Sequence, residues 1–212
     1  MAFTGAGGKT TIMLQLAREA LAAGLRVLVT VSTRMYAPDP AEFGQPLYDA
    51  AQLQGKHLAV YAGGYDAASG KLLGASSIPS GFDLVLVEAD GAAGKPLTAP
   101  LEHEPVIPSS TTTVLAVAGL DAIGLSLEKM HRPEVIARLA GVTPDAPITP
   151  AVVAAVLSHP EGNVKGRPAG ARVVYVLNKA DDGARKAASR ETALLLASQV
   201  FVTSYGQLTV SP

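Results

Sequence analysis

The stretch Gly5-Ala6-Gly7-Gly8-Lys9-Thr10-Thr11, GAGGKTT, is the most informative part of this 212-residue sequence. Small residues let backbone N–H groups turn toward an anion, and the N-terminus of a following helix adds a partial positive charge. We expect Lys9 to reach the β- and γ-phosphates of a nucleotide and the Thr10 hydroxyl to ligate Mg²⁺. The stretch therefore predicts a phosphate cradle that contains Gly5, Ala6, Gly7, Gly8, Lys9, Thr10 and Thr11.

The cradle departs from the G-x-x-x-x-G-K-[ST] pattern, whose first glycine would fall at Phe3. The denser glycines at 5, 7 and 8 compensate, and the alternative is a glycine-rich turn that caps an ordinary helix. Only residues 1–4 precede the cradle, although such a loop normally follows a buried central strand. We therefore expect a truncated first strand, and we interpret it as a start codon placed downstream of the natural one.

Apolar patterns outside the cradle alternate between strands and helices. A helix is expected over 9–23, closed by Gly24, and further helices near 133–139, 150–157 and 184–199. Strands are expected over 26–32, 83–87, 113–118, 172–177 and 200–203. The sequence predicts one α/β domain over 1–212 with a doubly wound, mainly parallel sheet of P-loop NTPase type, and an insertion at about 37–81 that contains a small hairpin.

Composition excludes several classes of function. The net charge of -1 and the lack of any basic run give no attraction for nucleic acid. The sequence has no cysteine, so a metal must use oxygen or imidazole ligands. No apolar stretch approaches the roughly 20 residues that span a bilayer. We expect a cytoplasmic protein with neither nucleic acid nor membrane as a partner.

The strand at 83–87 runs into Glu88, Asp90 and Gly91. A carboxylate at such a strand end beside a phosphate cradle can hold Mg²⁺, and a second can polarise an attacking water. The flexible Gly91 stands where a backbone N–H could sense a γ-phosphate. The sequence thus makes Glu88 and Asp90 candidates for both roles, although acids also end strands as solvated caps.

The segment Asn178-Lys179-Ala180-Asp181 directly follows the strand at 172–177. In an N-K-x-D segment the aspartate accepts hydrogen bonds from guanine N1–H and the exocyclic amine, which adenine cannot supply. We therefore expect Asn178, Lys179 and Asp181 to bind the base, and GTP to be preferred over ATP. Residues 203–205 are where a second base-contacting loop would lie.

Histidine-bearing motifs and one arginine form a further set of candidates. His103, His131 and His159 each lie beside an acid and a proline, and with Arg132 they could line a substrate or metal pocket. Arg34 follows the second strand and could contact phosphate or cofactor. The alternatives are loop histidines bonded to backbone and a solvated strand-end arginine.

Several motifs together resemble the YqeC family of P-loop proteins over nearly the whole chain. They are GAGGKTT at 5–11, VEADGAAGKPLTAP at 87–100, EHEPVIP at 102–108, GLDAIG at 119–124, HRPE at 131–134, HPEG at 159–162 and LNKAD at 177–181. The resemblance implies an accessory protein that handles a selenium-containing cofactor or serves a selenium-dependent molybdenum hydroxylase, which would be its partner. The glutamate-ended strand is also similar to that of GTPases that load nickel, at the level of the fold.

The preferred hypothesis is a slow GTPase whose nucleotide state switches the loop at 91–108. Catalysis would depend on Lys9, on Mg²⁺ held by Thr10 and an acid, and on Glu88 or Asp90, which would position the water. Two alternatives stay open: a small-molecule kinase or phosphotransferase whose acceptor is held by the histidine motifs, and a noncatalytic nucleotide-binding docking module.

Overall fold

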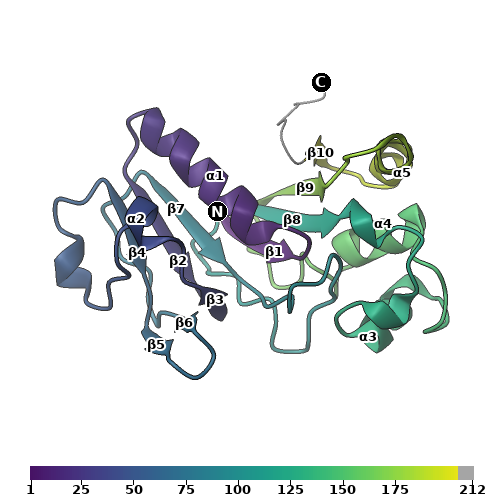
Figure 1. Cartoon of the computed structure of the whole chain (residues 1–212), viewed down its shortest axis with the longest axis horizontal. Helices are drawn as coiled ribbons and strands as arrows, with labels where there is room; N and C mark the ends of the chain where they lie inside the picture. Colours follow the sequence, from purple (N-terminus) through teal and green to yellow (C-terminus); the bar gives the residue numbers. More distant parts are fainter. Residues whose placement is uncertain (205–212) are drawn as a thin grey trace.

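A computed structural model describes residues 1–204 and contains a seven-stranded sheet whose strands all run parallel (Figure 1). The strand order is β10-β9-β8-β1-β7-β2-β4. The strands are β1 (Ala2–Gly5), β2 (Val27–Val31), β4 (Leu58–Tyr61), β7 (Leu84–Glu88), β8 (Thr113–Gly119), β9 (Arg172–Asn178) and β10 (Gln199–Val202). Long crossover connections join them, as parallel strands require, and several of these connections contain helices.

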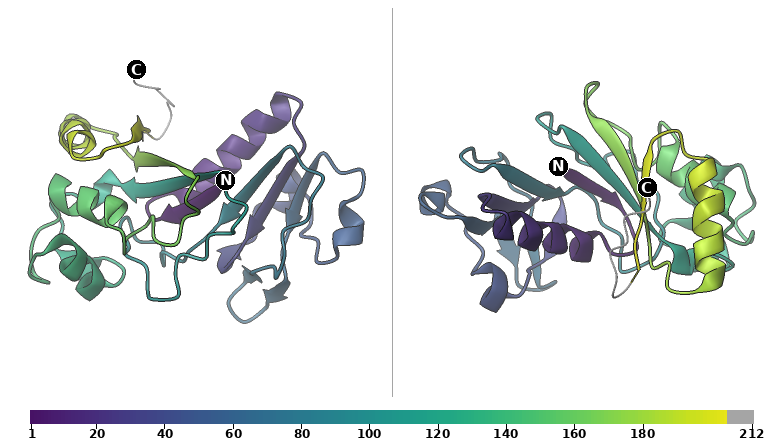
Figure 2. Two further views of the ribbon diagram at one scale, coloured as in Figure 1. Left: turned by 180° about the vertical axis from the view of Figure 1, so that it is seen from behind. Right: turned by 90° about the horizontal axis from the view of Figure 1, so that it is seen from above.

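Helices cover both faces of the sheet (Figure 2). On one face, α1 (Lys9–Ala22) and α2 (Pro40–Phe43) share a core with the odd-numbered residues of β2, such as Val29. On the other face, η1 (Ala50–Leu53) covers the even-numbered Leu28, while α3 (Pro133–Ala140) and α4 (Pro150–Ser158) cover Ala116 and Ala118 of β8. The remaining helices are η2 (Leu120–Ala122), η3 (Leu127–Lys129) and α5 (Gly183–Leu194). This alternation confirms the predicted doubly wound α/β fold.

The central strand β1 is as short as the sequence indicated. It pairs with β8 through four residues but with β7 only through Ala2 and Phe3. Phe3 is fully buried, and the amino group of Met1 donates to the carbonyl of Val85 at 2.6 Å. The stub is therefore anchored on both sides, and it delivers residue 5 to the carboxyl edge of the sheet.

A second, three-stranded antiparallel sheet follows β2 at that same edge (Figure 1). It consists of β3 (Arg34–Tyr36), β6 (Lys71–Leu73) and β5 (Gly64–Asp66), in that order. The hairpin of β5 and β6 agrees with the small hairpin expected within 37–81. The bounds of the insertion need correction, because β4 lies inside 37–81 yet pairs with β2 in the main sheet. The last helix also ends earlier than expected, at Leu194 rather than at residue 199.

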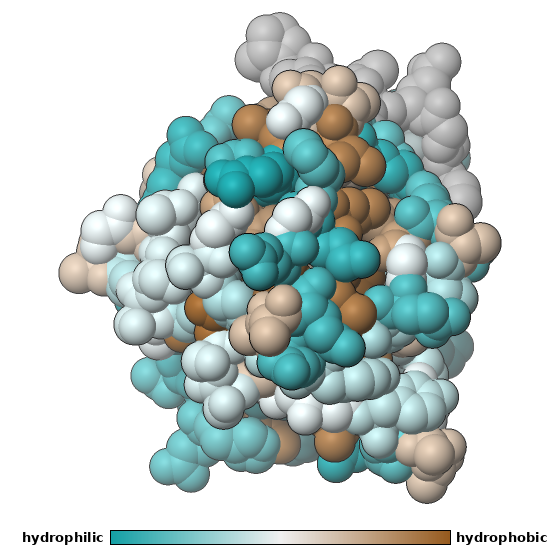
Figure 3. Space-filling view, turned by 90° about the vertical axis from the view of Figure 1, so that its left-hand side faces the viewer, coloured by the Kyte–Doolittle hydropathy of each residue, from teal (hydrophilic) through white to brown (hydrophobic). Residues whose placement is uncertain are grey.

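The β4 edge of the main sheet is partly covered by the chain that leads to it, because Leu47 forms a bridge to Tyr61. Viewed from this side, a narrow apolar band is interrupted by hydrophilic side chains (Figure 3). Within residues 1–204, no helix is long and apolar enough to cross a membrane.

Candidate functional site

The loop between β1 and α1 can be formed only by glycine at three positions. Gly5, Gly7 and Gly8 have φ angles of 86°, 79° and 123°. A Cβ atom at Gly5 would lie 2.2 Å from the carbonyl oxygen of Val117, and one at Gly8 would lie 2.3 Å from Nδ2 of Asn178. The loop therefore lies against β8 and β9 with no space for side chains.

The loop amides fall into two groups. Three of them donate to the protein's own oxygens: Gly5 to Oδ2 of Asp90 at 2.7 Å, Ala6 to the Val117 carbonyl at 2.9 Å and Gly7 to the Lys95 carbonyl at 3.2 Å. The amides of residues 8–11 have no acceptor among the described residues, and no side chain caps α1. The donors open to a ligand therefore belong to residues 8–11, a narrower set than the sequence suggested.

Lys9 is folded back under the loop. Its Nζ donates to the Gly5 carbonyl at 2.5 Å and lies 2.8 Å from Oδ1 of Asp90. Both side chains are buried, with 4% and 1% exposed. Burial raises the pKa of the Asp90 carboxyl, and the Lys9 ammonium opposes that rise. In this structure Asp90 thus holds the loop together behind the cleft, which differs from the metal and water-positioning roles expected for it.

Glu88, unlike Asp90, lines the cleft. Its Oε2 accepts a hydrogen bond of 2.6 Å from the Thr10 hydroxyl, and both residues line the cleft. Burial raises the pKa of the Glu88 carboxyl, whereas Lys9 and Thr10 oppose the rise, and Lys71 on the facing small sheet also lowers it. The hydroxyl and carboxylate oxygens are adjacent hard donors of the kind that Mg²⁺ takes together with phosphate and water. The donor set therefore fits the expected ion.

The loop after β9 is tied to the glycine loop. Asn178, which is buried, donates from Nδ2 to the Gly7 carbonyl at 2.7 Å and accepts from the Thr203 hydroxyl at 2.7 Å. Lys179 has a φ of 64°, and its ammonium lies 2.7 Å from Asp121. Asp181 lies beyond it at the surface, so Asn178 and Lys179 line the cleft but Asp181 does not. Thr203 thus contacts Asn178 and does not line the cleft, and Tyr205 lies outside the described residues.

The resulting cleft has a volume of about 710 Å³ and lies at the carboxyl edge of the sheet. Its charged lining consists of five cationic residues and one acidic residue, namely Lys9, Arg34, Lys71, Lys95, Lys179 and Glu88. Open parallel sheets bind ligands at this edge, where the strand order reverses. The cleft therefore has the position, the size and the electrostatic potential for an anionic ligand.

The histidine motifs lie apart from the cleft. Nδ1 of His131 is 2.9 Å from the Thr98 hydroxyl, and Nδ1 of His159 accepts from the Glu161 amide at 3.0 Å. His103 is exposed, and none of the three lines the cleft. No group of three His, Asp or Glu side chains within 1–204 is arranged to hold a metal. The three histidines therefore belong neither to this cleft nor to a metal-binding group among residues 1–204.

Two of the distinctive motifs meet instead in an ion pair. Arg132 pairs with Glu104 and donates to the Ala99 carbonyl at 3.1 Å. Arg132 has a φ of 63° where it precedes α3. This contact fixes the loop at 91–108 to the N-terminus of α3, which is a structural role and not a cleft contact.

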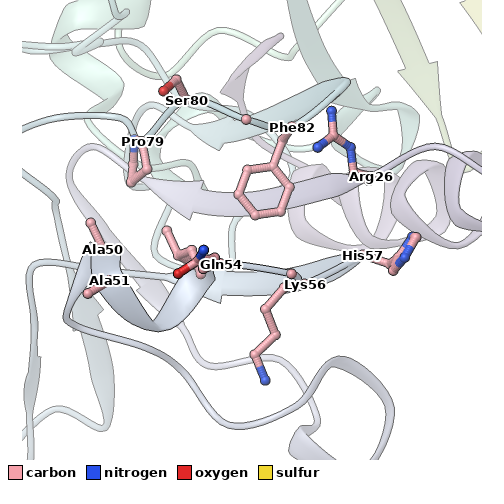
Figure 4. A pocket seen from close by; sticks show the side chains of 12 residues that line it. Arg26, Ala50, Ala51, Gln54, Lys56, His57, Pro79, Ser80 and Phe82 are labelled. Carbon is pink, nitrogen blue, oxygen red and sulfur yellow. The ribbon is translucent and has the colours of Figure 1, made fainter.

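A second hollow, of about 440 Å³, opens on the opposite edge of the sheet (Figure 4). Arg26, His57 and Phe82, which line it, precede β2, β4 and β7 respectively. The hollow is therefore at the amino ends of the strands, away from the glycine loop and Glu88. Ligand sites of open α/β sheets lie at the other edge, so we do not assign it as the candidate site.

The sequence interpretation missed three polar side chains of the cleft. Tyr36, Lys71 and Lys95 line it together with the glycine loop. The first two come from the small sheet, where only the strand register brings them to one face. Lys95 lies within the long motif at 87–100, where Gly91, Gly94 and Pro96 were the local signal of a loop.

The fold and the cleft define a class of α/β proteins in which a glycine-rich loop joins the central strand of a parallel sheet to a helix. The model of the YqeC protein family matches residues 1–134. The chain is also 37% identical, over 193 residues, to the uncharacterized protein YqeC of Escherichia coli (strain K12), with 82% of this chain and 73% of that protein covered. The chain belongs to the YqeC family. No solved structure matches it.

Proposed function

We propose that this chain is a magnesium-dependent P-loop protein that binds guanine nucleotides and hydrolyses GTP slowly. The observation that carries the proposal is the 2.7 Å hydrogen bond from Asn178 to the Gly7 carbonyl. It joins an N-K-x-D segment to a phosphate-type loop across 171 positions of sequence. If the N-K-x-D segment and the phosphate cradle had unrelated roles, they would have no reason to share a buried hydrogen bond, so the bond favours one common nucleotide site.

The open amides of residues 8–11 support a site for the phosphates, because they add to the positive end of α1. Thr10 and Glu88 would hold Mg²⁺, which when bound neutralises charge on the phosphates. Lys9 would extend from Asp90 toward the phosphates as they enter. Glu88, with a pKa raised by burial, is the acid best placed to orient a water.

The cellular role in the proposal comes from the family resemblance. A nucleotide-gated accessory factor would handle a selenium-containing cofactor or deliver it to a molybdenum hydroxylase. The contact from Gly7 to Lys95 supports the gating part, because it connects the cradle to the loop at 91–108.

Thermal unfolding with GTP, GDP, ATP and ADP, each with and without Mg²⁺, tests nucleotide binding and base preference together. A ligand at 100 times its Kd that binds only the folded state adds about 2.7 kcal/mol of apparent stability. We expect guanine nucleotides with Mg²⁺ to stabilise the protein most. Equal stabilisation by all four, or by none, would contradict the proposal.

The guanine preference has its own variant. Asp181→Asn places an NH₂ group where the carboxylate would accept from guanine, so the advantage of GTP over ATP should fall at least tenfold. Asp145→Asn, in an exposed loop between α3 and α4, is the matched control and should change nothing. Phosphate release measured over hours then separates slow hydrolysis from binding without turnover.

A further inference from the structure

The cleft is wider than the nucleotide site proposed above. In the strand order, the glycine loop follows the central β1, and the N-K-x-D segment follows β9, two strands away on one side. A nucleotide bound to both would extend over β8. The other half of the cleft, over β7 and β2, is walled by the small sheet.

The small sheet presents a built face to this half. Tyr36 is paired with Lys71 across β3 and β6, and Arg34 lies two residues before Tyr36, so all three share one face. The alternate residues Met35 and Leu72 are buried in the core and fix that orientation. Because one face of the small sheet is buried in the core, the orientation of the opposite face toward the cleft is fixed.

The chemistry of this face suits a flat, anionic molecule. The Tyr36 side chain is 64% exposed although it is large and aromatic. The Lys71 ammonium lies 4.8 Å from the centre of its ring, and the Arg34 guanidinium lies 3.7 Å from the Asp66 carboxylate, its one ion pair within residues 1–204. Two cations beside an aromatic surface can bind an anion and stack a ring.

Lys71 also faces the reactive end of the proposed nucleotide site, because it lines the same cleft as Glu88 and Thr10. Glu88 is the residue that contacts Thr10 at the start of α1. The small-sheet face is thus on the phosphate side of the cleft and not on the base side. A molecule held there would lie next to the terminal phosphate.

We infer that Arg34, Tyr36 and Lys71 form a subsite for a second ligand, a small molecule that carries a phosphate or similar anion on a planar ring. The inference rests on the proposed nucleotide site, since that site leaves this half of the cleft free. It assigns the role of holding a second substrate to the small sheet instead of the histidine motifs.

The test uses phenyl phosphate as the probe and the full chain saturated with GDP and Mg²⁺. Ligand-observed NMR should detect phenyl phosphate binding that GDP does not displace. Lys71→Ala should weaken it at least tenfold, and Tyr36→Ala should remove its advantage over inorganic phosphate. Lys56→Ala, a lysine at the opposite edge of the sheet, is the control and should leave it unchanged.

The outcomes separate this inference from the proposed function. Failure of GDP to bind the wild type defeats the proposed function. If GDP binds but phenyl phosphate does not, or competes with it, the second subsite is wrong. A further outcome would also refute the subsite. In it, Lys71→Ala lowers the affinity for GTP tenfold and leaves the affinity for GDP unchanged, and the GDP-loaded protein does not bind phenyl phosphate. The cations would then bind the γ-phosphate instead of a second ligand. GDP affinity that is equal in all variants, with selective loss of phenyl phosphate, supports it.

Discussion

Replacing Lys9 by alanine should destabilise the protein before any ligand is considered. The Lys9 ammonium is the counter-ion of Asp90, and the two side chains are 4% and 1% exposed, so solvent screens neither. Removing one partner of a buried ion pair costs about 3–5 kcal/mol, because the other charge stays buried without compensation. Asp90 would keep only the hydrogen bond from the Gly5 amide.

A second variant distinguishes this cost from a general failure to fold. In Lys9→Ala/Asp90→Asn the buried charge is gone, and the new amide oxygen can still accept from Gly5. The double variant should therefore recover at least half of the stability lost in Lys9→Ala, since the remaining losses are one hydrogen bond and a small cavity. It should still fail to gain stability from GDP, because the ammonium is absent.

Urea unfolding followed by far-UV circular dichroism measures both variants, and the free energies follow by linear extrapolation. A loss below about 1 kcal/mol for Lys9→Ala would mean that Lys9 is not paired in the free protein. A double variant no more stable than the single one would refute the assignment of the cost to the buried Asp90 charge.

Two more predictions concern single residues. Gly8→Ala should lower the free energy of unfolding in urea by about 2–4 kcal/mol, because φ is 123° and the new Cβ would meet the buried Asn178. Gly170→Ala, where a Cβ meets open space, should cost under about 1 kcal/mol. Equal losses in the two variants would contradict the packing of the glycine loop against Asn178. The hydrogen bond from Arg26 lowers the pKa of the Asp83 carboxyl to about 2, so the pair contributes fully to stability above about pH 4 and this contribution is lost as the pH falls toward about 2. Over that interval at low salt, the urea midpoint of the wild type should fall more than that of Asp83→Asn, and parallel curves would argue against the pair.

The main sheet could be predicted because its strands are buried on both faces. After Arg172, a run such as 172–177 is apolar, and such runs between helical patterns indicate parallel strands with little ambiguity. The strand β4 was different. Leu58–Tyr61 is a four-residue run inside a proline- and glycine-rich segment, and its pairing with β2 depends on tertiary packing that local pattern does not encode.

The candidate site also contains residues that local motifs predict and contacts that only tertiary packing creates. The glycine loop, Glu88 and the segment at 178–181 were predicted from local motifs, and the structure brings the first two and Asn178 into one cleft. The pairing of Lys9 with Asp90 was not predictable, since it joins positions 81 apart through a sheet register. Lys71 of the small sheet was missed because it is an ordinary surface residue until β3 and β6 pair, whereas Arg34 of the same sheet was already a candidate.

The loop amides that donate to the protein's own oxygens determine how the site would respond to a ligand. The Gly7 amide donates to the Lys95 carbonyl at 3.2 Å, and the next residue, Pro96, accepts from the Gly119 amide at 2.8 Å. A hydrogen bond to a charged phosphate oxygen is roughly twice as strong as one to a neutral carbonyl. A phosphate that recruits Gly7 would therefore displace Lys95, while the bond to Gly119 keeps Pro96 in place. Movement would be confined to the five residues from Gly91 to Lys95, which connect Glu88 and Asp90 to the motif that follows.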